Sequence, residues 1–217
     1  MNFEDMSLKT FVSALAKKDP VPGGGGAAAL TATVGMALGN MVGNLTVGKK
    51  KYISVESEII DLIEKAEALQ RELLNLIQRD AECFAPLSKA YGLPAKTEAE
   101  RSEKEKIMEK CLMQACSVPI IIMEKCCKAI DLTEEFAAKG SKTAISDAGC
   151  SAALLKSALR SASLNVYINT SYMKNRDRAM QLENYADDML SSYSKKADSI
   201  FDFVTENIRK NDKDFKG

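Results

Sequence analysis

The chain has 217 residues, and its 30 Lys and Arg balance its 30 Asp and Glu, so the formal net charge is zero. A chain of this length usually forms one domain with enough buried surface to need no disulfide or metal for stability, so we expect a single domain over residues 1–217. The balanced charge argues against a nucleic-acid-binding protein, and the polar start without a signal peptide predicts a cytoplasmic location.

Apolar residues recur at helical spacing along most of the chain and predict about six helices. They cover residues 5–18, a segment that starts among the glycines at 23–26 and ends near 47, and residues 54–91, 97–138, 146–172 and 176–208. Thr97 followed by Glu100 is the signature of a capping box at the start of the fourth helix. Since no stretch alternates with a period of two, we predict an all-α bundle of long amphipathic helices around a Gly/Ala-rich central helix.

The second helix is uncharged, because no charged residue occurs between Pro20 and Gly48. Its length suits a membrane span, and Gly35, Gly39 and Gly43 form the small-xxx-small pattern of closely packed helices. It also carries several Thr and Asn, and the other helices are amphipathic enough to cover it. We therefore favour the middle of a soluble bundle or a tight subunit interface, and we expect a homodimer and no membrane association.

Four glycines, Gly23, Gly24, Gly25 and Gly26, precede the second helix. A bend after Pro22 needs only one or two of them, so four favour a backbone that closely approaches a ligand. Free N–H groups at a helix N-terminus suit a negative charge or an electron-rich carbonyl. No strand precedes the glycines and no Gly-Lys-Ser/Thr follows them, which excludes a Walker A loop and a dinucleotide-binding fingerprint.

Basic residues follow the same helix, in the order Lys49, Lys50, Lys51 and Tyr52. Lysines at this position are usually a solvated helix end, where cations suit the helix dipole. Beside a ligand pocket they would also form an anion clamp.

The chain contains no histidine, and its six cysteines show no paired ligand spacing. The commonest acid/base group and the commonest zinc ligand are therefore missing, and we expect no bound metal. Ser-His-Asp and Cys-His catalysis within one chain are excluded. Proton transfer must use Asp, Glu, Lys, Tyr or Cys with a shifted pKa.

Two carboxylates and two amides are candidate site residues. Asp80 interrupts an apolar stripe, so it is either paired with a nearby cation or held for function with a perturbed pKa. Asp147 lies where the fifth helix should begin, and N-capping would explain either Ser146 or Asp147 without a site. Asn165 and Asn169 share a helix face, and their amides need a partner from another helix, a subunit or a polar ligand.

Several of these segments, taken together, resemble the formiminotetrahydrofolate cyclodeaminase family, which also includes methenyltetrahydrofolate cyclohydrolases. The matching segments are residues 22–30, 45–52, 80–82, 93–94, 146–148 and 164–169. They come in the family's order and spacing, and the resemblance covers about residues 8–207. Family members usually carry Ser at the position of Gly26.

The resemblance implies an all-helical domain that dimerises and holds tetrahydrofolate, in its mono- or polyglutamylated form, between helices. Such enzymes cyclise N5-formiminotetrahydrofolate to the 5,10-methenyl form with loss of ammonia, or hydrolyse the methenyl bridge to 10-formyltetrahydrofolate. The sequence does not separate these reactions, although we lean towards the cyclodeaminase. A non-catalytic helical dimer that binds folate or acts as a scaffold is the alternative.

The resemblance and the residue chemistry together suggest a role for each candidate, with no cofactor beyond the folate substrate. Asp147 is predicted to face the reacting bridge or the pterin, and Asp80 to act as a second carboxylate. The remaining predicted contacts are Asn165 and Asn169 for the pterin edges, Gly23 to Gly26 for close backbone approach, and Lys49, Lys50, Lys51 and Tyr52 for the glutamate tail.

Overall fold

A computed structural model describes residue 3 and residues 5–214 of the chain, with side chains up to residue 210. The helices are α1 (Leu8–Leu15), α2 (Gly24–Asn44), α3 (Glu56–Tyr91), α4 (Glu98–Lys139), α5 (Ile145–Ser171) and α6 (Arg176–Asp214), with short 3-10 turns at Lys50–Tyr52 and Lys142–Ala144. No strand occurs in the described part of the chain. The predicted all-α class is confirmed, and so is the capping box of Thr97 and Glu100.

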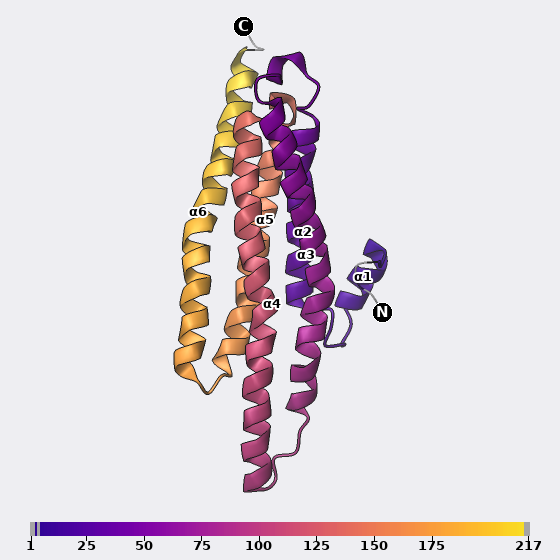
Figure 1. Ribbon diagram of the computed structural model, residues 1–217, viewed down its shortest axis with the longest axis vertical. Helices are drawn as coiled ribbons and strands as arrows, with labels where there is room; N and C mark the ends of the chain where they lie inside the picture. The colour runs from indigo at the N-terminus through magenta and orange to yellow at the C-terminus, as the bar shows by residue number, and fades with distance from the viewer. Residues whose placement is uncertain (1–2, 4, 215–217) are drawn as a thin grey trace.

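Five of the helices form the bundle, in which α3 and α4 lie in front of α2 and α5 in Figure 1 and α6 packs beside α4 and α5. α2 and α5 run antiparallel. An added Cβ on Gly24 would lie beside the Asn165 side chain, one on Gly35 3.0 Å from Leu155 Cγ, and one on Gly39 3.3 Å from Ser151 Oγ. The small residues of α2 therefore allow close helix packing inside this bundle.

Within the described residues, α2 is the one helix long and apolar enough to cross a membrane. It packs against α3, α4 and α5, and 56% of its most apolar stretch is buried. These contacts are those of a core helix, although one face of α2 stays exposed along its length.

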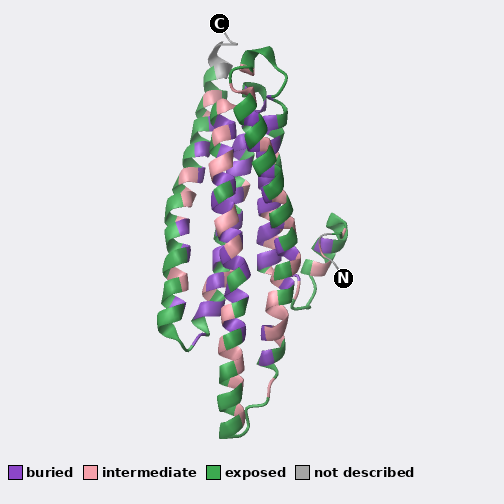
Figure 2. Cartoon of the chain, in the orientation of Figure 1, coloured by how far each residue is buried: buried purple, intermediate pink, exposed green. Residues whose placement is uncertain are grey.

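Two parts of the molecule extend beyond the bundle. The α3–α4 hairpin projects past the ends of α2 and α5 at the bottom of Figure 1, and its outer turns are largely exposed (Figure 2). α1 starts later than predicted because Ser7 caps it at Thr10, and it ends earlier, at Leu15. It stands off to one side of the bundle (Figure 1). Its one buried residue is Phe11, whereas Leu8 and Val12 are exposed.

Candidate active site

A cavity of about 290 Å³ opens where the N-terminus of α2 and the C-terminal half of α5 meet α3 and α4. Five predicted site residues line it: Gly23, Gly24, Asp80, Asn165 and Asn169. Three helices far apart in the sequence thus bring together the glycines, one carboxylate and both amides. This mixture of hydrogen-bonding groups and apolar wall suits a polar ring system bound between helices.

Asp80 supplies a carboxyl group to this cavity. Its Oδ2 accepts the N–H of Gly26 at 2.9 Å, and no Lys or Arg is among the residues that line the cavity. The predicted pairing with a neighbouring cation is not present among the described ion pairs. Burial raises the pKa of the Asp80 carboxyl to about 6, and the bond from Gly26 opposes that rise. A pKa close to neutrality suits a group that takes up and releases a proton.

Two of the four glycines make room for neighbouring side chains of the protein itself. An added Cβ on Gly25 would lie 2.6 Å from Asp80 Oδ2, and one on Gly24 would lie 2.9 Å from Asn165 Oδ1. Gly26 differs, because its nearest neighbour would be Ile77 Cγ2 at an ordinary 3.6 Å. Gly23 and Gly24 line the cavity, so the predicted ligand approach remains possible for those two. Asn165 and Asp80 therefore explain why glycine is needed at positions 24 and 25.

The two amides lie one helical turn apart on α5. Asn165 donates from Nδ2 to the carbonyl of Ser161 at 2.9 Å, and Asn169 is only 6% exposed. With its Nδ2 held by the helix, Asn165 presents Oδ1 towards the first turn of α2. Both amides therefore border the same space as the Asp80 carboxylate.

Sequence reasoning missed the apolar wall of the cavity, which Phe84, Tyr91, Pro119 and Ile168 help to form. Phe84 lies one turn after Asp80 on α3, and Tyr91 lies two further turns along a similar face, so helical spacing could have indicated both. Tyr91 also packs edge-on against Tyr172, with ring centroids 6.4 Å apart. Burial raises the pKa of the Tyr91 hydroxyl.

At the opposite end of the bundle, near the top of Figure 1, lie the 3-10 turn of Lys50–Tyr52, which Lys49 precedes, and the first turn of α5 with Asp147. Lys49 Nζ donates to Ser141 Oγ at 2.9 Å, and Tyr52 accepts the N–H of Lys142 at 3.0 Å. That bond and the nearby lysines lower the pKa of the Tyr52 hydroxyl. We call Lys49, Lys50, Lys51, Tyr52 and Asp147 the basic end.

The N-capping interpretation of Ser146 and Asp147 is wrong. The N-cap residue of α5 is Ala144, because the 3-10 turn at Lys142–Ala144 runs directly into the helix. Asp147 is therefore inside the first turn, half-buried, where a carboxylate interacts favourably with the helix dipole.

One chain does not bring all the predicted residues together. Asp147 and Asn165 belong to the same straight run of α5 and are separated by about 27 Å at a rise of about 1.5 Å per residue. Gly23 to Gly26, Asp80, Asn165 and Asn169 meet at the cavity, while the basic end lies a bundle's length away. In the described part of the chain, no group of three or more His, Cys, Asp or Glu is arranged to hold a metal ion.

Comparisons with known proteins agree on one family. The profile of the formiminotransferase-cyclodeaminase family matches residues 7–188. The methenyltetrahydrofolate cyclohydrolase of Methylorubrum extorquens is 38% identical over 93% of this chain and 97% of its own length. The formimidoyltransferase-cyclodeaminase of Rattus norvegicus is 33% identical over 76% of this chain, and the match spans 30% of that longer protein. The crystal structure of formiminotetrahydrofolate cyclodeaminase from Thermotoga maritima has a TM-score of 0.77 and 26% identity, over 95% of this chain and 98% of that one. The chain therefore belongs to the formiminotransferase-cyclodeaminase family.

Proposed function

We propose that this protein is an enzyme of folate one-carbon metabolism that acts on the 5,10-methenyl bridge of tetrahydrofolate, as a methenyltetrahydrofolate cyclohydrolase. The observation that carries the proposal is the half-buried Asp80 carboxylate, which shares a cavity with Asn165 and Asn169 at the N-terminus of α2. The hydrolytic reaction is favoured over the cyclodeaminase reaction expected from the sequence, because the relative named for hydrolysis matches over almost its whole length at 38% identity.

Hydrolysis of the methenyl bridge needs a group that first accepts a proton and then donates it. Water adds to the cationic carbon between N5 and N10, and a carboxylate can remove its proton as the carbon–oxygen bond forms. When the carbon–N5 bond of the tetrahedral adduct breaks, the same group can return that proton to N5, and the hydroxyl proton leaves as the formyl C=O forms. A carboxyl group whose pKa is about 6 is suited to both steps near neutral pH. An ionised Asp80 also stabilises the positive charge of the bridge.

The second candidate is the cyclodeaminase reaction, which uses the same cavity but expels ammonia while the bridge closes. It is supported by the fold shared with the Thermotoga maritima enzyme over 95% of the chain. An assay that offers both substrates and follows methenyl absorbance together with ammonia separates the two. Loss of absorbance without ammonia indicates the cyclohydrolase, and gain of absorbance with ammonia indicates the cyclodeaminase. Folate binding without either turnover would leave a non-catalytic dimer.

We further propose that the protein works as a cytoplasmic homodimer, with no cofactor beyond the tetrahydrofolate substrate. The uncharged exposed face of α2 supports the dimer, and the burial of the rest of α2 supports a bundle that does not enter a membrane. We assign Lys49, Lys50 and Lys51 to the glutamate tail of the substrate, because they are three consecutive cations. Tyr52 follows them, and Lys51 Nζ lies 5.8 Å from the centroid of its ring.

A further inference from the structure

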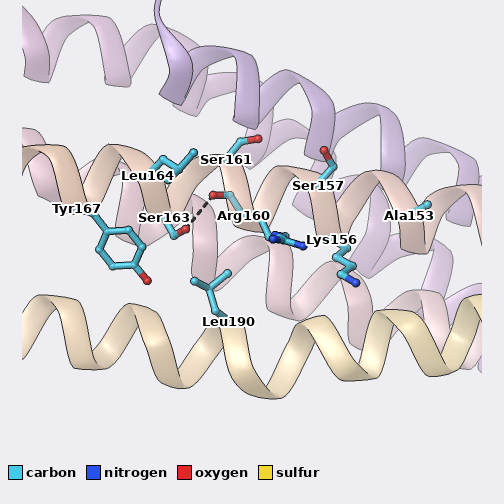
Figure 3. Close-up of a pocket in the computed structure, with 9 residues that line it drawn as sticks. All are labelled: Ala153, Lys156, Ser157, Arg160, Ser161, Ser163, Leu164, Tyr167 and Leu190. Atoms are coloured by element: carbon cyan, nitrogen blue, oxygen red, sulfur yellow. Dashed lines mark hydrogen bonds between the residues drawn. The ribbon is translucent and has the colours of Figure 1, made fainter.

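Two hollows of the molecule differ in how their polar groups are satisfied. The larger is a groove of about 590 Å³ between α5 and α6, which Figure 3 shows. There Lys156 Nζ donates to Asp198 Oδ1 at 2.6 Å, and Ser163 Oγ donates to the Arg160 carbonyl at 2.8 Å, the dashed line of the figure. The Arg160 side chain is exposed and can bond to water. The smaller cavity, which contains Asp80, is different, because it holds a backbone carbonyl that its own helix cannot satisfy.

A proline in the middle of α4 removes the helical partner of this carbonyl. Pro119 is buried and has no N–H, so it cannot donate to the carbonyl of Ala115, one turn earlier. Ala115 is only 5% exposed, and Ala115 and Pro119 both line the cavity. The proline ring lies against the carbonyl that it deprives of a donor, so the carbonyl is on the side of α4 that borders the cavity. Since a buried backbone carbonyl costs free energy unless it accepts a hydrogen bond, we expect a donor inside the cavity.

Pro86 has the same effect on α3, but at the outside of the molecule. It removes the donor for the carbonyl of Glu82. Glu82 is exposed, and neither Glu82 nor Pro86 is among the residues that line the cavity, so solvent can satisfy that carbonyl. The two prolines therefore form a natural comparison, because one frees a carbonyl at the cavity and the other frees a carbonyl at the surface.

The antiparallel register of α3 and α4 places the Ala115 carbonyl close to the level of Asp80. An ion pair joins Glu72 of α3 to Lys125 of α4. Counting along both helices from this pair puts Asp80 at the level midway between Ala115 and Pro119, which is about 3 Å along the axis from each. Asp80 Oδ2 accepts a backbone N–H from α2, which leaves Oδ1 for a ligand. The cavity therefore offers two acceptors, a carboxylate and a carbonyl, at nearly the same level on neighbouring helices.

Two such acceptors suit the water that attacks the methenyl bridge. A water that donates one O–H to a carboxylate and the other to a carbonyl has a lone pair free to face the cationic carbon. We propose that the Ala115 carbonyl, freed by Pro119, positions the attacking water for Asp80. As the water oxygen bonds to the carbon, the π pair of the carbon–nitrogen double bond returns to nitrogen and the proton goes to Asp80, while the carbonyl holds the second O–H. This role rests on the hydrolysis proposed above.

Returning the missing N–H to α4 tests the proposal. In Pro119→Ala the new N–H donates to the Ala115 carbonyl and takes the acceptor away from the water. The kcat for hydrolysis of the methenyl bridge should fall roughly 10- to 100-fold, the cost of a misplaced reactant. KM and the Kd for 5-formyltetrahydrofolate, which has no bridge to hydrolyse, should keep their wild-type values. Pro86→Ala is the control and should change neither kcat nor KM, because the carbonyl that it satisfies belongs to the exposed Glu82.

A second variant separates the lost acceptor from lost packing. Pro119→Val supplies the same N–H and keeps the bulk of the ring, so it should lose kcat as Pro119→Ala does. Wild-type kcat in both variants would overturn the role of the carbonyl and leave the proposed function standing. An equal loss of kcat and of 5-formyltetrahydrofolate binding would also overturn it, since Pro119 would then serve only the shape of α4. A wild-type protein that releases ammonia from the formimino substrate and hydrolyses no methenyl bridge would overturn both proposals.

Discussion

A single carboxyl group, Asp80, ties the stability of the protein to the chemistry of its cavity. Burial raises its pKa to about 6, compared with about 3.9 in an unfolded chain. Because the folded state then holds the proton more tightly, the contribution of Asp80 to folding stability is complete below about pH 4. It is lost as the pH rises through 6, when the half-buried carboxylate must carry its charge with no Lys or Arg among the residues that line the cavity.

The Asp80→Asn variant should therefore be more stable but inactive. Asn keeps an oxygen that can accept the Gly26 N–H and removes the buried charge. At pH 8 we expect a gain in unfolding free energy of up to about 3 kcal/mol, and below pH 4 almost none. Turnover should fall by roughly 10²–10⁴, the usual range for one acid/base group. Denaturant unfolding at both pH values and a turnover assay check this, and wild-type turnover would remove Asp80 from the mechanism.

Replacing Gly25 and Gly26 one at a time by Ala tests why glycine is needed before α2 and in its first turn. Gly25→Ala places a methyl group 2.6 Å from Asp80 Oδ2, so the carboxyl must move and its bond to Gly26 is disturbed. We expect a loss of roughly 1–3 kcal/mol in unfolding free energy. Gly26→Ala meets its nearest neighbour at 3.6 Å and should be neutral or stabilising by up to about 1 kcal/mol. Thermal unfolding of both variants measures the difference, and equal stabilities would contradict this account.

Asp147 supplies the corresponding test at the basic end. Its position inside the first turn of α5 means that Asp147→Asn removes a charge from the helix N-terminus, at a cost of about 0.3–1 kcal/mol. As a site residue it should also lose roughly 10²–10⁴ in turnover when changed to Asn. Melting temperature and turnover are measured on the same sample. A small loss of stability with normal turnover would mean that Asp147 serves only the helix.

Among the elements, α2 connects the two parts of the proposed site. Its first turn forms one wall of the cavity and its last turn leads into the lysines, so the length of one helix sets the spacing between them. The chain bends at Gly48, where φ is +78° and a glycine is favoured. The bend directs the lysines towards the start of α5, where Lys49 bonds to Ser141.

Changing Lys49, Lys50 and Lys51 together to Ala should weaken substrate binding more than turnover. These side chains are assigned to the glutamate tail, remote from the reacting carbon, so their contribution is the same in ground state and transition state. KM should rise, most for polyglutamylated substrate, and the difference should shrink with added salt. Lys106→Ala with Lys110→Ala on the exposed face of α4 is the control. Equal binding of mono- and polyglutamate forms by the triple variant would end the clamp hypothesis.

For the whole molecule, the expected assembly is a dimer at micromolar concentration, measurable by light scattering. Val34→Glu places a charge on the exposed, uncharged face of α2 and should yield a folded, helical monomer with little activity, because burying an unpaired carboxylate in the dimer is costly. Ile60→Glu on α3 should stay dimeric and active. A monomeric wild-type protein would contradict the expectation.

Local patterns made most of the fold predictable. Apolar spacing predicts where the helices lie. Helix ends that are set by adjacent residues are predicted well too, as with the capping box of Thr97 and Glu100 at the start of α4. The family resemblance also came from the sequence, since it depends on the order and spacing of short segments. The wrong N-cap prediction for Ser146 and Asp147 has a local cause too. The 3-10 turn at Lys142–Ala144 leads directly into α5, which begins at Ile145, before either of these residues could cap it.

The partners of the site residues depend on the register between helices, which no local pattern specifies. Asp80 meets Gly26 from 54 residues away, and Gly24 meets Asn165 across two antiparallel helices. Only the tertiary structure could show that Gly25 makes room for a carboxylate and that no Lys or Arg is among the residues that line its cavity. It also places Asp147 about 27 Å from Asn165 along one helix. The sequence by itself indicated which groups are candidates for the chemistry, because residue types and their spacing are local, and the packing of the helices decided which of these groups lie together at one cavity.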